Sequence, residues 1–294
     1  MPTPPMTGAG LLGIDRMVNT RDGRQLRTMV RGDGPDLVVL EAGLGLSGLY
    51  WDGVHDALAS RVRVVAYERA GYGMSDPATS PRTLSNLATD LEDVIAAFPH
   101  ERLVLVGHSW GGPIIRTLAA RLPADSSLAG LVLVDPSDEN AGLYFAPMVA
   151  RHFSAQAATL APLARVRLLG RLTRGTTTGL REPHRSAVTA ASTSLAAARV
   201  TAAEQRYFIT ELAALRGTAP ALGNLPMRVI SGQLADPFGA KIRKSLTEAH
   251  RQTVTQNPGA TYVPAHRSAH MIPLSEPDLI AAEALALFDS EASQ

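Results

Sequence analysis

The chain of 294 residues contains no cysteine, and this absence excludes several kinds of chemistry. Without a thiol there is no disulfide, no thiolate zinc site and no cysteine nucleophile. Aromatic residues make up only 5% of the chain, and we interpret the arginines as scattered, without a basic run that alternates with aromatic side chains. With a formal net charge of +1, the sequence gives no electrostatic argument for nucleic acid or for an anionic membrane.

Long apolar runs are also missing. No stretch is long enough to span a bilayer, and residues 1–5 do not place a basic region before an apolar one, so no secretory signal is expected. We therefore expect a cytoplasmic protein. Its apolar share of 45% is sufficient for a sizeable core, either in one large domain with an insertion or in two modest domains.

Short apolar runs recur along the chain at the spacing of βα units, as is typical of parallel strands buried on both faces. The expected strands are 38–40, 62–66, 103–106, 131–134, 227–230 and 261–263. The pair Asp22-Gly23 between 14–20 and 25–30 predicts an antiparallel hairpin before them. Helical segments such as 84–98 and 114–122 alternate with the strands. The pattern predicts an α/β fold, a mostly parallel sheet with N-terminal antiparallel edge strands and helices on both faces.

The alternation stops between residues 139 and 218. This stretch is rich in Ala, Arg, Leu and Thr and predicts helices near 153–169, 183–198 and 202–216, with no convincing strand. Pro147, Pro162 and Pro183 are expected to mark helix starts or kinks. It is either a lid over the carboxyl ends of the strands or an independent helical domain. We favour the lid because the chain returns directly to a strand at Met227 without a flexible linker. The expected domains are a core of 1–138 and 219–294 and a helical cap of 139–218.

The most informative motif is the G-x-S-x-G pentapeptide centred on Ser109. A strand is expected before Gly107 and a helix after Gly111, which is the context of a serine nucleophile on a tight, strained turn. Glycines flank the serine because the turn leaves no room for side chains, and the helix N-terminus favours negative charge that develops beside it. We predict that Ser109 is a catalytic nucleophile rather than an ordinary serine in a glycine-rich turn.

A serine hydroxyl needs a base, and the base needs an orienting acid, each in a loop after a strand. His270 is the preferred base because its loop follows the last expected strand and carries an apolar anchor, and His266 is the rival. Asp236 is the preferred acid because it lies in a turn-rich loop after the strand ending near 232. Asp135, which also ends a strand, is the alternative.

The oxyanion of the reaction needs two backbone N–H donors. We predict the amide of Trp110, directly after the nucleophile, and the amide of Leu44 in the glycine-rich loop after the first parallel strand. That loop lacks the Lys-Ser/Thr of a P-loop and the spacing of a dinucleotide site. Gly43, Gly45 and His108 are predicted to contribute to substrate binding.

These motifs resemble the α/β-hydrolase superfamily over nearly the whole chain. The landmarks that match are 38–45, 67–77, 107–111, 131–136 and 268–277. Two departures stand out: Ala42-Gly43 where members often have His-Gly, and Glu68 where they often have Asp. We interpret Glu68 as a structural carboxylate that holds the turn at 71–73. Epoxide hydrolases and haloalkane dehalogenases of similar architecture use an Asp nucleophile, which this chain lacks.

The resemblance and the motifs together predict a serine hydrolase of an uncharged ester, lactone or thioester, in which the acyl or alcohol part is apolar. The alternatives are a non-hydrolytic enzyme on the same fold, such as a cyclase, lyase or acyltransferase, and a small-molecule receptor in which the lid is a switch. No cofactor, metal or nucleic-acid partner is expected. The remaining histidines are interpreted as isolated surface or packing residues: His55, His100, His152, His184 and His250.

Overall fold

A computed structural model describes residues 8, 10–123, 125–235 and 239–289 and contains one eight-stranded sheet. The strands are β1 (Ile14–Asn19), β2 (Gln25–Arg31), β3 (Asp36–Glu41), β4 (Arg63–Tyr67), β5 (Arg102–His108), β6 (Leu128–Val134), β7 (Met227–Gly232) and β8 (Ala260–Ala265). Their order in the sheet is β1-β2-β4-β3-β5-β6-β7-β8. β2 pairs antiparallel with β1 and β4, and all other neighbours are parallel. The expected α/β fold with antiparallel edge strands is confirmed.

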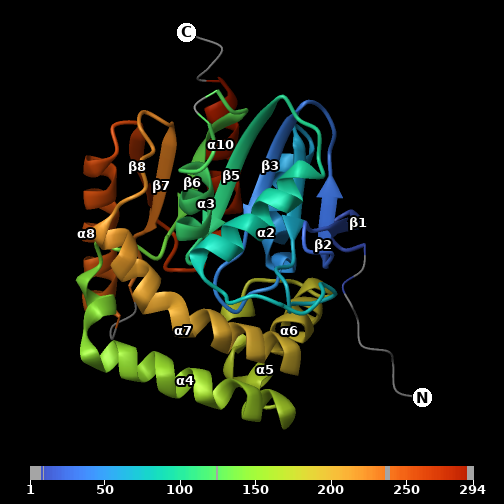
Figure 1. Cartoon of the computed structure of the whole chain (residues 1–294), viewed down its shortest axis with the longest axis vertical. Coiled ribbons are helices and arrows are strands. Elements are labelled where there is room, and N and C mark those ends of the chain that lie inside the picture. Colours follow the sequence, from blue (N-terminus) through green and yellow to red (C-terminus); the bar gives the residue numbers. More distant parts are fainter. Residues whose placement is uncertain (1–7, 9, 124, 236–238, 290–294) are drawn as a thin grey trace.

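Helices cover both faces of the sheet (Figure 1). Those of the core are α1 (Asp52–Ala59), α2 (Leu84–Ala96), α3 (Gly111–Ala119), α8 (Ala240–Gln256), α9 (Ile272–Ser275) and α10 (Pro277–Asp289), with a short 3-10 helix η1 (Gly48–Trp51). The alternation of side chains along a strand divides the core into two layers. Val38 and Leu40 of β3 pack with the residues of α1 and α10, whereas Leu37 and Val39 pack with those of α2 and α3.

Between β6 and β7 the chain forms helices joined by loops, with one isolated β-bridge from Thr178 to Leu180, and we call residues 139–218 the helical segment. Its elements are η2 (Gly142–Phe145), α4 (Pro147–Arg165), α5 (Leu169–Leu172), η3 (Arg174–Thr177), α6 (His184–Thr193) and α7 (Leu195–Gly217). They lie together along one end of the sheet (Figure 1). The expected range 153–169 was wrong, because α4 begins at Pro147, one of the prolines expected to mark a helix start, where no intrahelical hydrogen bond is lost. A second expected boundary was also wrong. The break near 199–201 lies instead at Ser194, whose hydroxyl caps α7 by accepting from the Ala197 amide.

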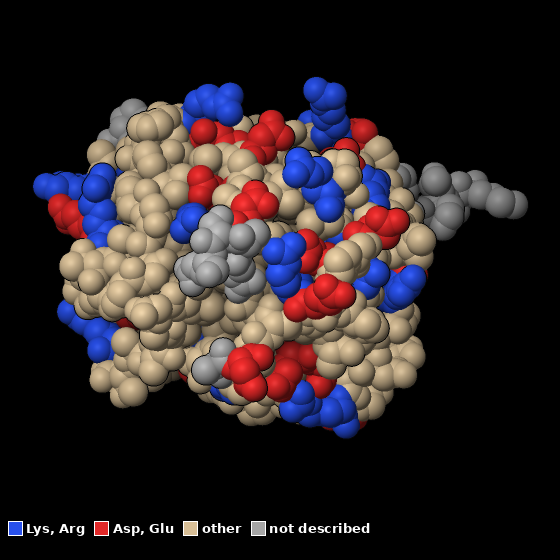
Figure 2. Space-filling view, turned by 90° about the horizontal axis from the view of Figure 1, so that it is seen from above, with Lys and Arg blue, Asp and Glu red and all other residues tan. Residues whose placement is uncertain are grey.

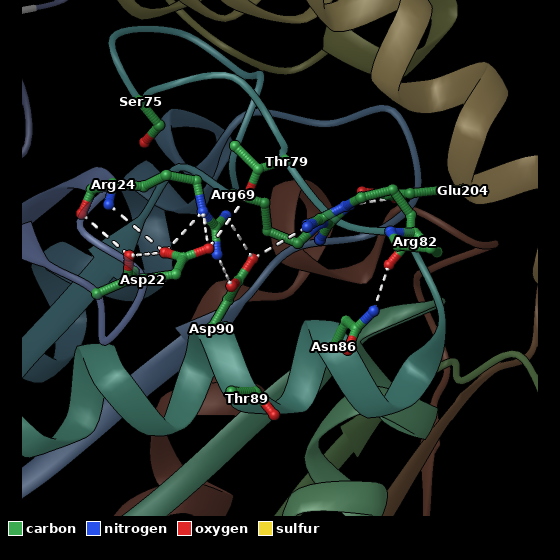
Figure 3. Close-up of polar contacts among 12 residues, drawn as sticks. Asp22, Arg24, Arg69, Ser75, Thr79, Arg82, Asn86, Thr89, Asp90 and Glu204 are labelled. Carbon is green, nitrogen blue, oxygen red and sulfur yellow. Dashed lines mark hydrogen bonds and ion pairs between the residues drawn. The ribbon is translucent and has the colours of Figure 1, made fainter.

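A buried ion-pair cluster fixes the loop between β4 and α2. Arg24, from the turn after β1, and Arg82, just before α2, both donate to Asp90 at 2.6 and 3.0 Å (Figure 3).

Glu68 lies in the loop between β4 and α2. Its Oε2 accepts from the Met74 amide at 2.8 Å, and a Cβ on Gly73 would overlap the carboxylate. Glu68 therefore holds the 71–73 turn, as expected.

The surface at the end of the molecule shown in Figure 2 carries acidic and basic side chains intermixed, with no patch of one sign. No helix within the described ranges has the length and apolar character needed to cross a membrane.

Candidate active site

Ser109 lies on a tight turn between β5 and α3, in the left-handed region with φ of 52°. Such a conformation is costly for a residue with a side chain and is maintained only by its surroundings. The turn is fixed because the Ser109 amide donates to Val134 O and its carbonyl accepts from the amides of Gly112 and Ser137. A Cβ on Gly107 would lie 2.5 Å from Gly111 O, so the motif requires glycine here through close backbone approach.

His270, in the loop after β8, is hydrogen-bonded to Asp135 at the end of β6. The distance from Nδ1 to the Asp135 Oδ2 is 2.7 Å. The preferred acid, Asp236, lies outside the described residues, and the structure brings the alternative, Asp135, to the histidine. His270 is half-exposed and lines the same cavity as Ser109. His266 is also exposed but lines neither of the hollows that adjoin Ser109.

Asp135 is a buried carboxylate with a full set of donors. Arg243 of α8 donates to both its oxygens at 2.6 and 2.7 Å, and the Gly232 amide donates to Oδ1 at 3.0 Å. Burial by itself raises the pKa of Asp135, but the hydrogen bonds from Arg243 and His270 outweigh it, and the pKa lies below the usual range of aspartate. The carboxylate is therefore ionised when it accepts from His270.

His108 is fully buried beside His270, with the ring centroids 4.8 Å apart. One ring nitrogen, Nε2, lies 3.0 Å from the His270 carbonyl oxygen. Burial, together with the neighbouring His270, lowers the pKa of His108 to about 3, so its ring is neutral near pH 7. His108 lines the cavity at Ser109, as do Gly43 and Gly45, which were expected with it. It also supports the His270 loop, which was not expected.

The loop after β3 lies directly beside the nucleophile. A Cβ on Gly43 would be 3.4 Å from the Ser109 Cβ and 3.1 Å from the His108 Nδ1. Among the described residues, neither the Leu44 amide nor the Trp110 amide has a hydrogen-bond acceptor. Both amides are therefore free of an acceptor within this part of the chain, as donors to an oxyanion would have to be.

Arg69, which the sequence did not single out, holds this loop from behind. Its guanidinium donates to the carbonyl oxygens of Ala42 and Gly43 at 2.6 and 2.9 Å. It also pairs with Glu41 at the end of β3 and with Glu204 of α7, so all five of its N–H groups have acceptors. The position is buried. In the sequence Arg69 lies within the matching landmark 67–77, and its partner Glu41 directly precedes the departure at Ala42-Gly43.

Two hollows meet at Ser109. One, of about 250 Å³, reaches into the helical segment, which contributes nine threonine, serine and glutamine side chains to its wall. The other, of about 440 Å³, is lined mainly by apolar side chains, among them Phe153, Phe208 and Ile242. Ser109, Leu44 and His270 line both. The expectation of an apolar substrate therefore suits the second hollow and not the first.

The site offers no metal centre: within the described ranges, no group of three or more His, Asp or Glu side chains is placed to hold an ion. His55 and His250 are buried and each is hydrogen-bonded. For His55, burial lowers the pKa to about 4. Both act in packing, as expected from the sequence.

A serine on a strained strand–helix turn, at the carboxyl edge of a mostly parallel eight-stranded sheet, defines the α/β-hydrolase class. A family model described as the alpha/beta hydrolase fold matches residues 36–211, more than half of the chain. The chain belongs to the α/β-hydrolase fold family.

Known proteins similar to the chain agree with this assignment. An AB hydrolase superfamily protein of Gibberella zeae is 25% identical over 84% of each chain. A putative carbamate hydrolase RutD of Caulobacter is 40% identical, but only over 29% of this chain and 32% of that protein. The chain spans 27% of the length of an uncharacterized protein of Mycobacterium tuberculosis, with 32% identity.

Solved structures extend the similarity of the fold. The epoxide hydrolase CorEH has a TM-score of 0.73 at 18% identity. The match covers 94% of this chain and 99% of CorEH. An esterase from Exiguobacterium antarcticum has a TM-score of 0.66 at 16% identity, covering 94% of this chain and all of that one. At this level of identity the likeness concerns the fold alone.

Proposed function

We propose that the protein is a serine hydrolase that cleaves a carboxylic ester, lactone or thioester. The observation that carries the proposal is that Ser109, on its strained turn, and His270, which is hydrogen-bonded to the buried Asp135, line one cavity. The family assignment and the hydrolase names among similar proteins support a hydrolase.

The mechanism follows from the roles of these groups. Ser109 Oγ attacks the carbonyl carbon while His270 Nε2 takes its proton, and the ionised Asp135 orients the ring through Nδ1. The negative carbonyl oxygen is bound by the Leu44 and Trp110 amides. His270 then protonates the leaving alcohol or thiol as the bond to it breaks. Water hydrolyses the acyl-enzyme by the same steps and restores Ser109. In the structure no hydrogen bond joins Ser109 to His270 within the described ranges, and such contacts commonly tighten with substrate.

The two hollows that meet at Ser109 suit a substrate with a group on each side of the bond that breaks. We propose that the helical segment acts as a cap, because its side chains form most of the wall of the smaller hollow. That volume lies below the range of about 300–1,000 Å³ that is typical for drug-sized ligands, which favours a small group on that side.

Labelling with a fluorophosphonate tests the nucleophile and the enzyme class together. The native protein should be modified at Ser109, because an activated serine attacks the phosphorus and the oxyanion donors bind its oxygen. Mass mapping of the adduct, with Ser109→Ala and heat-denatured protein as controls, checks the site. No adduct, or one on another residue, contradicts the proposal. Turnover of a 4-nitrophenyl ester then separates a hydrolase from a receptor that only binds, and product analysis separates hydrolysis from acyl transfer or cyclisation.

Arg69 is proposed as a positioning residue for the oxyanion site. In a trans peptide the C=O and the next N–H point in opposite directions. Because Arg69 holds the Gly43 carbonyl, the Leu44 N–H is directed away from Arg69. Glu204 reaches Arg69 from α7 of the proposed cap (Figure 3), so the cap and the oxyanion loop depend on the same guanidinium.

Arg69→Lys should lower kcat by about 10- to 100-fold while KM changes by less than about threefold, because the loss of one oriented oxyanion donor affects the transition state. Affinity for a trifluoromethyl ketone, whose adduct carries the oxyanion, should fall in parallel. The matched control is Arg116→Lys, since Arg116 is a buried arginine that makes a bidentate pair with Glu139 away from the loop. Equal losses of kcat in the two variants at equal melting temperature would show that Arg69 is merely structural. If Arg69→Lys does not fold, Glu204→Gln takes its place, with an expected loss of about three- to tenfold.

A further inference from the structure

The charges of the chain are divided unevenly between the helical segment and the rest. Residues 139–218 contain ten arginines, no lysine and four acidic residues, whereas the remaining residues contain 18 basic and 23 acidic ones. Two of the four acidic residues, Glu139 and Glu204, are buried against core arginines. The exposed surface of the helical segment is therefore strongly basic, although the chain as a whole has a net charge of only +1.

A groove of about 1060 Å³ on this segment gathers four of the arginines. Its wall includes Arg167, Arg171, Arg174 and Arg185, and Glu182 is the one acidic residue of the described chain that lines it. Arg167, Arg171 and Arg174 are exposed, and none of their guanidinium groups forms an ion pair or a hydrogen bond within the described ranges. These groups present unused donors and positive charge to whatever enters the groove.

The groove adjoins the smaller hollow at Ser109. Thr177, Thr189 and Thr193 line both of them. The hydroxyls of these three threonines already donate to backbone carbonyls of their own helices, so toward a ligand they offer only acceptor lone pairs. The groove with the arginines and the hollow at Ser109 therefore share a polar border.

We propose that the substrate carries an anionic group, a carboxylate or a phosphate, that binds among Arg167, Arg171 and Arg174 while its ester reaches Ser109. This inference rests on the proposed function and specifies its substrate: an apolar part fits the hollow lined by Phe153 and Phe208, and an anionic part lies on the opposite side of the bond that breaks. Guanidinium groups bind carboxylate and phosphate in a bidentate manner, and clustered charge of one sign raises the local concentration of an oppositely charged substrate. In this respect the substrate differs from the uncharged one expected from the sequence.

The test compares 4-nitrophenyl hexanoate with mono-4-nitrophenyl adipate, which has the same acyl length but ends in a carboxylate. The adipate should have a kcat/KM at least about tenfold higher at low ionic strength, and the advantage should shrink several-fold in about 0.5 M salt, where charges are screened beyond about 4 Å. A mono-4-nitrophenyl ester with a terminal phosphate in place of the carboxylate distinguishes the two anions.

The double variant Arg171→Gln/Arg174→Gln should reduce the preference for the adipate by about five- to tenfold and leave kcat/KM for the hexanoate within about twofold. The matched control is Arg199→Gln/Arg206→Gln, which removes the same charge from exposed arginines of the same segment that line a separate hollow. That control should keep most of the preference.

Three results would overturn the inference. The first is an equal kcat/KM for the two esters in the wild type. The second is an equal loss of the preference for the adipate in the two double variants. The third is binding to phosphatidylglycerol vesicles without any preference for the adipate, which would assign the arginines to a membrane surface. A wild-type protein that hydrolyses neither ester and is not labelled at Ser109 contradicts the proposed function instead. Hydrolysis of both at equal rates contradicts only the anion site.

Discussion

Ser109→Ala should lower kcat/KM for a 4-nitrophenyl ester by about 10⁴-fold or more. The variant loses the atom that attacks, and only the oxyanion donors and substrate binding remain to accelerate hydrolysis. The serine is partly exposed on its turn and its hydroxyl makes no hydrogen bond with the described residues, so the melting temperature should change little. Initial rates and thermal unfolding of the same preparation check both expectations.

The matched control for this prediction is Ser137→Ala. Ser137 is buried, lines the larger hollow and donates its amide to the Ser109 carbonyl, but its backbone contact survives the substitution. Its rates should stay within about tenfold of the wild type. A Ser109→Ala protein that retains near-native turnover would assign the nucleophile to another residue.

Asp135→Asn should lower kcat by about 10³- to 10⁴-fold, the second largest effect that we expect. An amide at this position cannot keep the His270 ring in the tautomer that accepts the serine proton, nor stabilise the imidazolium that forms. The substitution also leaves Arg243 of α8 without its carboxylate, so a loss of stability should accompany the loss of rate. Measurement of kcat per folded molecule separates the two effects.

Asp236→Asn is the comparison that decides between the two aspartates. We expect its kcat to stay within a few-fold of the wild type. A large loss of kcat in Asp236→Asn, with little loss in Asp135→Asn, would show that Asp236 is the acid, as the sequence favoured.

Because the pKa of Asp135 lies below the usual range, the carboxylate stays ionised from pH 8 down to pH 5. Its contribution to stability is present above the ordinary aspartate pKa and is lost only as pH falls through the lowered value.

The centre of the sheet could be predicted from the sequence because its strands are almost continuously apolar. β3, β5 and β6 are buried on both faces, and a short apolar run such as Leu103 to Val106 is typical of such a strand. The helix boundaries between β6 and β7 were harder. Ser194 lies between two helices, where its extended backbone ends α6 and its hydroxyl caps α7, and an Ala-rich pattern does not reveal such a break.

The site was predicted in its local parts, whereas its long-range contacts could not be. Ser109 follows from a motif of five residues, and the glycines around it record contacts within the same turn. Both Asp135 and Asp236 follow a strand, so the acid that reaches His270 depends on which of these two loops approaches the loop after β8. From the sequence we chose between them by the turn-forming residues around each aspartate, and such residues carry no information on the distance to His270. Arg69 was missed for the same reason, since its partners lie 26 to 135 residues away.

The uneven distribution of charge can be counted in the sequence, but the net charge of the whole chain conceals it. Ten arginines between 139 and 218 are offset by acidic residues elsewhere, and a net charge of +1 reports only the sum. Charge is informative for each structural unit, and the unit must be delimited before its charge can be counted.

The two buried arginine–glutamate pairs that join the helical segment to the core have a consequence for protein engineering. Arg69 and Arg116 belong to the core, and Glu204 and Glu139, which pair with them, belong to the segment. A chimera that received this segment from a relative lacking those glutamates would leave Arg116 buried without its counter-ion, at a cost of about 3–5 kcal/mol, and would leave Arg69 with Glu41 of the core as its remaining carboxylate partner. Modules of this fold are therefore exchangeable only together with the charges that face them, and a graft should be designed as pairs of residues rather than as a contiguous stretch of sequence.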